Sequence, residues 1–148
     1  LDLSKYLNYV TKKTPLKGVP AFDALGVANG VATGENDEFG DTSNKPANFT
    51  TYSASKGGSK LSEGVVANEL LLNPMQQIGS EKATNAPYWY IRHGAIDRDT
   101  AFPIPLNLAM KLKNAGRNVN YLLAWNRPHS GDYALHELFD WLDSIARK

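Results

Sequence analysis

The sequence predicts an α/β fold for residues 83–148, where strand and helix signals alternate. Three observations support this: two short runs rich in aromatic and β-branched residues, an amphipathic helix between them, and a second such helix at the end. This βαβα order implies a parallel pair of strands with a right-handed crossover. Two parallel strands cannot bury both faces alone, so we expect further strands from elsewhere and regard the chain as a fragment.

The first strand is predicted over Tyr88–Gly94, which ends at a glycine. The following helix has Pro103 in its first turn and Gly116 at its end, with an apolar stripe of Ile104, Leu108, Leu112 and Ala115. Alternation from Val119 to Trp125 then predicts the second strand. The last helix is expected to be capped by Asp132 and to bury Leu135, Leu138, Phe139, Leu142 and Ile145, while Trp125 and Trp141 are assigned to the core.

Residues 1–82 are predicted to form a loop-rich, lid-like insertion. A helix is expected over residues 3–12, from apolar positions at helical spacing. The tract 18–60 is rich in Gly, Asn and Thr, and its segments 32–36 and 55–59 are typical of loops. Loops of such length are usually functional or lie against a larger body.

The bulk composition excludes several classes of protein. The 148 residues are 42% hydrophobic and 21% charged with a net charge of +1, which excludes a disordered chain. Its 16 Lys and Arg are spread among 15 acids, and no long apolar run occurs, so we expect neither nucleic acid nor a membrane as partner. Cysteine is absent, which excludes thiolate chemistry and leaves the compartment open.

An acid and a histidine follow the two predicted strands. Asp97 comes just after the first strand, and His129 comes 32 residues later, just after the second. Ligands and catalytic groups in open parallel sheets lie beyond the carboxyl ends of the strands. An aspartate followed by a histidine is the second half of a Ser, Asp, His catalytic triad, in which the carboxylate orients the imidazole and the imidazole moves the proton.

The nucleophilic serine of such a triad has no candidate in this sequence. It is expected in a Gly-x-Ser-x-Gly elbow between a strand and a helix, and no serine has that setting. Ser130 lies beside His129 but follows both partners in the chain. Because the sequence also begins at Leu1 rather than Met, we expect the serine and the oxyanion donors to come from an N-terminal part of the same hydrolase, which is then the partner of this chain.

The segment Tyr88–Thr100, with its Asp-Arg-Asp motif, resembles the late strand and acid loop of subtype B bacterial tannases and related feruloyl esterases of the α/β-hydrolase fold. The run Trp125–Trp141, containing His129-Ser130-Gly131-Asp132-Tyr133, continues the resemblance. The similarity is good over residues 72–145 and weaker before them. It implies the C-terminal portion of an α/β-hydrolase and a serine esterase that acts on galloyl or related phenolic-acid esters without a cofactor. The implied source is bacterial, with a secreted or periplasmic location left open.

The resemblance also implies a role for individual residues. Asp97 and His129 match the triad positions, and Asp99 matches an aspartate that contacts hydroxyls of the aromatic acid. Glu35 and Lys17 are the candidates for a glutamate and a lysine with the same task. Carboxylates and an ammonium group can read phenolic hydroxyls by charge-assisted hydrogen bonds. A fragment with this set of residues would be inactive alone.

Several alternatives stay open. Within the same fold, the pocket could suit a feruloyl ester or a peptide instead, and the chain could also be a small ligand-binding module without catalysis. Asp97 could be a turn residue and Asp99 a helix-start acid. His93 is expected to order the acid loop rather than to be catalytic, and His136 to be exposed. A metal site is not predicted, because paired histidines at helical spacing are absent.

Overall fold

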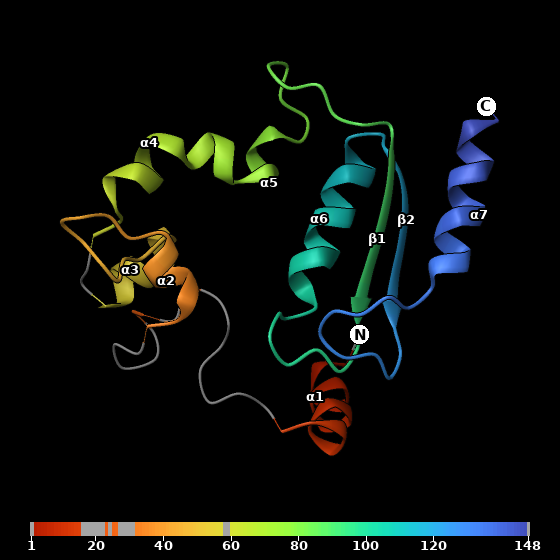
Figure 1. Cartoon of the computed structure of the whole chain (residues 1–148), viewed down its shortest axis with the longest axis horizontal. Coiled ribbons are helices and arrows are strands. Elements are labelled where there is room, and N and C mark those ends of the chain that lie inside the picture. The colour runs from red at the N-terminus through yellow and green to blue at the C-terminus, as the bar shows by residue number, and fades with distance from the viewer. Residues whose placement is uncertain (1, 16–22, 24, 27–31, 58–59, 148) are drawn as a thin grey trace. The chain divides into compact units, whose positions relative to one another are not determined.

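The structure, a computed structural model, separates into two units that are described in turn (Figure 1). The first comprises Leu1–Pro15 and Ile78–Lys148, and the second comprises Leu16–Gln77. The residues that the structure describes are 2–15, 23, 25–26, 32–57 and 60–147. None of the described helices has the length and hydrophobicity that a membrane crossing requires.

A two-stranded parallel sheet lies at the centre of the first unit. Strand β1 (Tyr88–Gly94) pairs with β2 (Asn118–Ala124) in a register that runs from Tyr88 opposite Asn118 to Gly94 opposite Ala124. Residues along β2 alternate between exposed and partly buried, as the predicted period of two requires. Both predicted strands and their parallel pairing are confirmed. Their carboxyl ends therefore lie side by side.

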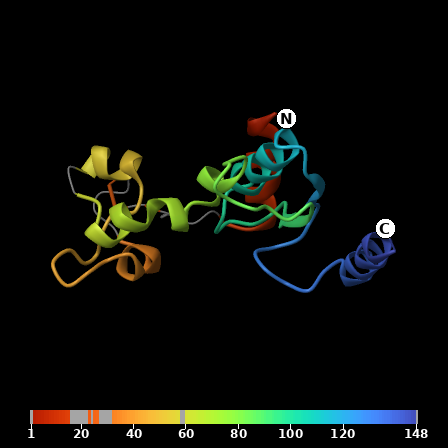
Figure 2. The same cartoon turned by 90° about the horizontal axis from the view of Figure 1, so that it is seen from above.

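Helices α6 (Pro103–Asn114) and α7 (Leu135–Ala146) lie on opposite faces of this sheet (Figures 1 and 2). Helix α6 begins with a proline, which suits the first turn, and Gly116 follows its end with a φ of +74°. It buries Ala109 and Leu112. Helix α7 contacts the other face through the rings of Tyr90 and Trp141, whose centroids are 5.3 Å apart.

Helix α1 (Leu3–Lys13) belongs to the first unit, although the sequence assigned it to the insertion. The predicted helix is confirmed, and the Asp2 side chain caps it by accepting from the Lys5 N–H at 3.1 Å. Its buried Tyr6 and Val10 form a small apolar core with Phe102 from the turn before α6. Helix α1 therefore packs against the segment between β1 and α6 and holds it in place.

Four predictions for the C-terminal half are wrong. Trp125 lies just beyond β2 and is 64% exposed, and Ile104 of the predicted stripe is exposed as well. Asp132 does not cap α7: the cap is Ala134, in a left-handed conformation with a φ of +64°. Helix α7 buries none of its residues, and Phe139 is 60% exposed. Its apolar stripe is as predicted, but the described residues leave much of it exposed.

The second unit contains four helices within its described residues: α2 (Gly34–Glu38), α3 (Thr51–Gly57), α4 (Glu63–Leu72) and α5 (Pro74–Gln77). The expectation of loop at 32–36 and 55–59 is wrong where α2 begins and where α3 ends. A capping box starts α2, since the Asn36 side-chain oxygen accepts from the Thr33 N–H at 3.1 Å. The Asn36 side-chain nitrogen also donates to the Asp23 carboxylate, 13 residues earlier, so contacts outside the helix help to fix its position.

The buried carboxylate of Asp23 holds the second unit together. Its Oδ1 accepts from the side-chain amides of Asn36 and Asn48, each at 2.8 Å. Its Oδ2 accepts from the Phe49 N–H at 2.9 Å, the Thr50 N–H at 2.7 Å and the Thr50 hydroxyl at 2.8 Å. Burial raises the pKa of Asp23, but these hydrogen bonds outweigh that effect and lower the pKa below its usual value.

Candidate catalytic site

The site is built at the carboxyl ends of β1 and β2, where two loops are joined by backbone hydrogen bonds. The Ala95 N–H donates to the Ala124 carbonyl at 2.8 Å, and the Ile96 N–H donates to the Arg127 carbonyl at 3.1 Å. The chain then turns, and the Asp97 N–H donates to the Gly94 carbonyl at 3.1 Å. These bonds extend the parallel pairing beyond the strands and carry Asp97 to the edge where the second loop starts.

Gly94 allows the two loops to approach this closely. A Cβ at this position would overlap the backbone carbonyl oxygens of Arg127 and Pro128. Glycine is therefore needed here because it has no side chain, and not because of an unusual φ. Close approach of another backbone is a recognised reason for a glycine in a strand. Any larger residue would push the loop with His129 away from the loop with Asp97.

The Asp97 carboxylate and the His129 imidazole meet in the structure. Their atoms Oδ2 and Nδ1 are 3.0 Å apart. The other carboxylate oxygen, Oδ1, accepts from the N–H groups of Asp99 and Thr100 at 2.7 and 3.0 Å. The Asp97 side chain is only 4% exposed, whereas that of His129 is 52% exposed. The carboxylate is thus fixed by its own loop and presents its second oxygen to the imidazole.

This geometry is suited to proton transfer at the other ring nitrogen of His129. A carboxylate next to Nδ1 favours the tautomer with its proton on Nδ1, which leaves Nε2 free to accept a proton. The same negative charge stabilises the imidazolium that forms. Because the His129 ring is half exposed, Nε2 remains accessible to a reacting group. Asp97 and His129 can therefore act together as the orienting acid and the base.

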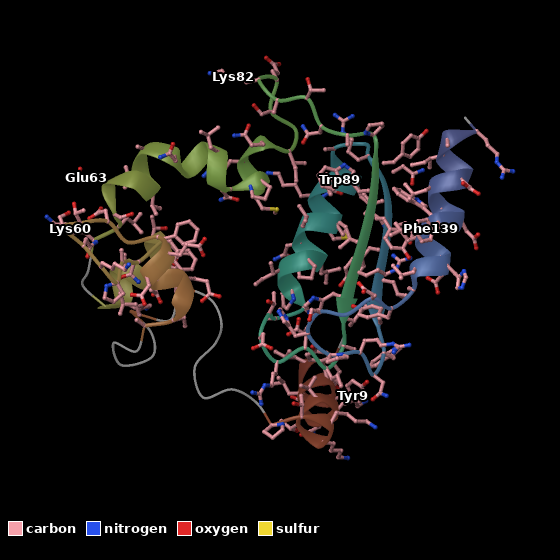
Figure 3. The ribbon with its side chains drawn as sticks, viewed as in Figure 1. Tyr9, Lys60, Glu63, Lys82, Trp89 and Phe139 are labelled. Carbon is pink, nitrogen blue, oxygen red and sulfur yellow. The ribbon has the colours of Figure 1, made fainter. Side chains whose placement is uncertain are left out.

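The loop that carries His129 has an unusual backbone. Asn126, Ser130 and Ala134 all have positive φ values, of 57°, 58° and 64°, although none of them is a glycine. Such conformations cost free energy and tend to gather at functional sites. Tyr9 of α1 fixes the start of the loop, since its hydroxyl accepts from the Asn126 N–H at 2.7 Å (Figure 3). The loop is thereby anchored at the end of β2.

His93, at the end of β1, also faces Asp97. Its Nε2 lies 3.7 Å from Asp97 Oδ2, and its side chain is 9% exposed. This nitrogen is buried and has no hydrogen-bond partner. Burial lowers the pKa of His93, and the charge of Asp97 opposes the effect only in part. The ring is therefore neutral at neutral pH.

A cavity of about 310 Å³ opens beside these side chains, and its walls come from both loops and from β1. Tyr133 contributes to its wall, and burial, with the charge of Asp97 as a smaller cause, raises the pKa of its hydroxyl. The hydroxyl therefore keeps its proton at neutral pH. The residues that line the cavity are Arg92, His93, Gly94, Asp97, Thr100, His129, Ser130, Gly131 and Tyr133.

Of the other predicted site residues, Asp99 and Glu35 are among the described residues and Lys17 is not. Asp99 lies in the acid loop, and its carboxylate, Asp97 and His129 offer ligand atoms within 4.8 Å of one another. These three groups could hold a divalent cation. Glu35 lies in the first turn of α2 in the second unit, and Lys17 lies outside the described residues. The predicted exposure of His136 is confirmed.

Sequence reasoning missed three contributors to this site: the close approach at Gly94, the two backbone donors to Asp97, and the hydroxyl of Tyr9. The Asp-x-Asp-Thr run after a strand is the signal that could have indicated backbone donors, since aspartates in turns accept from the residues that follow. Nothing local indicates Tyr9, which lies 117 residues before Asn126.

Comparison with known proteins gives one consistent set of relatives. No protein-family model and no curated protein sequence matches the chain. Among solved structures, it is 36% identical to a tannase from Lactobacillus plantarum, with a TM-score of 0.67 over 84% of this chain and 26% of that one. It is 39% identical to a Fusobacterium nucleatum tannase, with a TM-score of 0.62 over 76% of this chain and 24% of that one.

A third solved structure is a tannin acyl hydrolase in complex with ethyl gallate. It is 38% identical to this chain, with a TM-score of 0.63 over 75% of this chain and 24% of that one. The chain thus spans about a quarter of the length of the solved structures that it matches.

Proposed function

We propose that this tannase-like chain is the part of a serine esterase that supplies the acid and the base of its catalytic triad. The resemblance predicted from the sequence is confirmed by 36–39% identity to solved bacterial tannases. On this proposal the first unit is the C-terminal portion of an α/β-hydrolase and the second unit is a lid-like insertion. The reaction is hydrolysis of galloyl or related phenolic-acid esters.

The observation that carries the proposal is the 3.0 Å contact between Asp97 Oδ2 and His129 Nδ1. In the mechanism, a serine from an N-terminal part attacks the ester carbonyl while His129 Nε2 accepts the hydroxyl proton. His129 returns that proton to the departing alcohol, and Asp97 keeps the ring oriented throughout. Water then reacts with the acyl-serine in the same way, and the phenolic acid is released.

On this proposal, the acyl group is recognised by side chains that accept hydrogen bonds from its phenolic hydroxyls or donate hydrogen bonds to them. Asp99 is next to the triad pair, and Glu35 and Lys17 complete the set expected from the resemblance. The ethyl gallate bound to a related hydrolase supports this choice of substrate class. Hydrolysis rates of methyl gallate, methyl ferulate and aminoacyl esters, compared on one preparation, would distinguish the tannase from its feruloyl esterase and peptidase alternatives.

The test uses the hydrolase that contains both this chain and the serine-bearing part. We expect His129→Ala to lower kcat for methyl gallate by at least about 10⁴-fold, because the serine loses its base. His136→Ala, which changes an exposed histidine on α7, is the matched control and should leave kcat unchanged. Undiminished turnover by the His129 variant would contradict the proposal.

A metal-dependent hydrolase is the second candidate, because Asp97, Asp99 and His129 lie close enough to share a cation. The two candidates differ in their response to a chelator. A serine esterase keeps its activity after exhaustive treatment with EDTA, whereas a metal-dependent enzyme loses activity and regains it when zinc or manganese is added.

A further inference from the structure

We propose that His93 is a positioning residue of the same site, whose Nε2–H donates a fourth hydrogen bond to the Asp97 carboxylate. This inference rests on the proposed function, because it concerns the acid of the proposed triad. It assigns a task to a buried histidine that the mechanism above does not use.

The Asp97 carboxylate can accept one more hydrogen bond than its described partners supply. An ionised carboxylate has about four acceptor positions. Three are occupied: the N–H groups of Asp99 and Thr100 donate to Oδ1, and His129 Nδ1 lies 3.0 Å from Oδ2. The side chain is almost fully buried, so bulk water cannot readily fill the fourth position. An acceptor on Oδ2 is left facing the interior.

His93 has a buried ring nitrogen that lacks a hydrogen-bond partner. Its Nε2 is one of three buried side-chain nitrogens without a hydrogen-bond partner in the described part of the chain, the others being Nε of Arg92 and Arg117. Such atoms are rare, because burying an unpaired polar group costs free energy. The nitrogen lies 3.7 Å from Asp97 Oδ2, just beyond hydrogen-bond range. An unpaired ring nitrogen therefore lies close to the remaining acceptor.

The surroundings of His93 determine which of its ring nitrogens carries the proton. His93 is held neutral by burial, so it has one N–H, and two acceptors compete for it: Asp97 Oδ2 and the backbone of Thr100. A hydrogen bond to a charged acceptor is roughly twice as strong as one to a neutral carbonyl. The proton therefore lies on Nε2. Catalytic hydrogen bonds are often long in unliganded sites and shorten when substrate binds.

The hydrogen bond from His93 would fix the direction in which Asp97 Oδ2 contacts His129. With donors on both oxygens, the carboxylate cannot rotate about its Cβ–Cγ bond without breaking several hydrogen bonds. Without the His93 donor, Oδ1 is still held by the two backbone N–H groups, but Oδ2 is held by His129 alone, so the carboxylate can tilt about Oδ1 and the direction of the Asp97–His129 contact is less well defined. Loss of His93 should therefore reduce kcat more than it changes KM.

The test compares three substitutions at this position in the complete hydrolase. His93→Phe keeps a ring without a donor, His93→Gln places an amide N–H near the position of Nε2, and His93→Asn places it near Nδ1. We expect kcat for methyl gallate to fall about tenfold or more in the Phe and Asn variants, as when a hydrogen bond to a charged group is lost, and to recover within about threefold in the Gln variant. KM should stay within about twofold in all three.

A role limited to filling space predicts the opposite order, with Phe near the native rate and Gln impaired, and that result would overturn the inference. A second measurement does not depend on activity. Long-range ¹⁵N–¹H spectra of histidine-labelled protein should show His93 neutral with its proton on Nε2, and a proton on Nδ1 would also overturn it. If the native protein does not hydrolyse methyl gallate, the proposed function fails while the spectra still decide the role of His93.

Discussion

At the scale of single residues, the site depends on a carboxylate that its own loop holds in place, independently of the histidine. Asp97 is held by N–H groups of its own loop, at 2.7 and 3.0 Å, and the imidazole of His129 comes from a separate loop. Both positions could be predicted from the sequence, because they follow two neighbouring parallel strands. The N–H groups of Asp99 and Thr100 that donate to Oδ1 were not predicted, because these bonds depend on the exact backbone conformation of the turn after β1.

Gly94 provides a test at the residue scale. In Gly94→Ala, the added methyl group meets the carbonyls of Arg127 and Pro128, so we expect the free energy of unfolding to fall by about 1–3 kcal/mol. The displaced loop should also separate His129 from Asp97 and reduce kcat. Both effects can be measured on the complete hydrolase, by chemical denaturation and by methyl gallate turnover.

The control is Gly64→Ala in α4, where an added Cβ meets nothing within 4 Å. Alanine is the better helix former, so this variant should be as stable as the native protein or slightly more so. If Gly94→Ala is as stable and active as the control, the close approach of the two loops has no functional importance.

At the scale of elements, the sequence predicted best the segments whose apolar positions repeat. Strand β2 and helices α1 and α6 follow such patterns, and the structure confirms all three. Strand β1, predicted from its aromatic and β-branched residues, is confirmed as well. Helices α2 and α3 were not predicted, because the contacts that hold them come from residues distant in sequence. Asp23, for example, accepts from Thr50, which lies 27 residues later. No local pattern encodes such a bond.

The Asp23 network predicts how the second unit responds to acid. The folded-state pKa of Asp23 is lowered, so the unfolded chain binds the proton more tightly than the folded unit does. Its contribution to stability is therefore complete above the ordinary aspartate pKa of about 4 and is lost as the pH falls through the lower, folded-state value. Protection of the Phe49 and Thr50 amides from hydrogen exchange, corrected for intrinsic rates, should fall in this range.

Asp23→Asn should abolish this acid dependence while reducing protection at neutral pH, because the amide cannot replace both carboxylate oxygens. Asp37→Asn, an exposed position on α2, serves as the matched control and should behave as the native protein does. Equal acid profiles for the native protein and Asp23→Asn would show that other groups control the unit.

At the scale of the whole molecule, the first unit presents apolar side chains that its own residues do not cover. Phe139 on α7, labelled in Figure 3, is 60% exposed. Trp125 is 64% exposed and Leu122 of β2 is 43% exposed. The errors in predicting the core are concentrated here. Periodicity correctly indicated which face of α7 is apolar, but it cannot say which part of a larger protein would bury that face.

On the proposed function, the serine-bearing part of the hydrolase covers this face. Phe139→Glu should therefore weaken assembly of the two parts, because the charge would have to be desolvated in the contact. Asp140→Asn on the same helix should have no such effect. Size-exclusion chromatography of the two parts, expressed together, measures the fraction assembled. Assembly of the Phe139 variant at the native level would mean that α7 does not take part in the contact.

The central claim is that Asp97 and His129 act as one catalytic pair, and a double-mutant cycle in the complete hydrolase tests it most directly. We expect Asp97→Asn to lower kcat for methyl gallate by about 10⁴-fold, through loss of the orienting carboxylate, and His129→Ala to lower it at least as much. The double variant should be no slower than His129→Ala alone, within about threefold, because the carboxylate acts only through the imidazole. Losses that multiply, or native turnover in either single variant, would contradict the account.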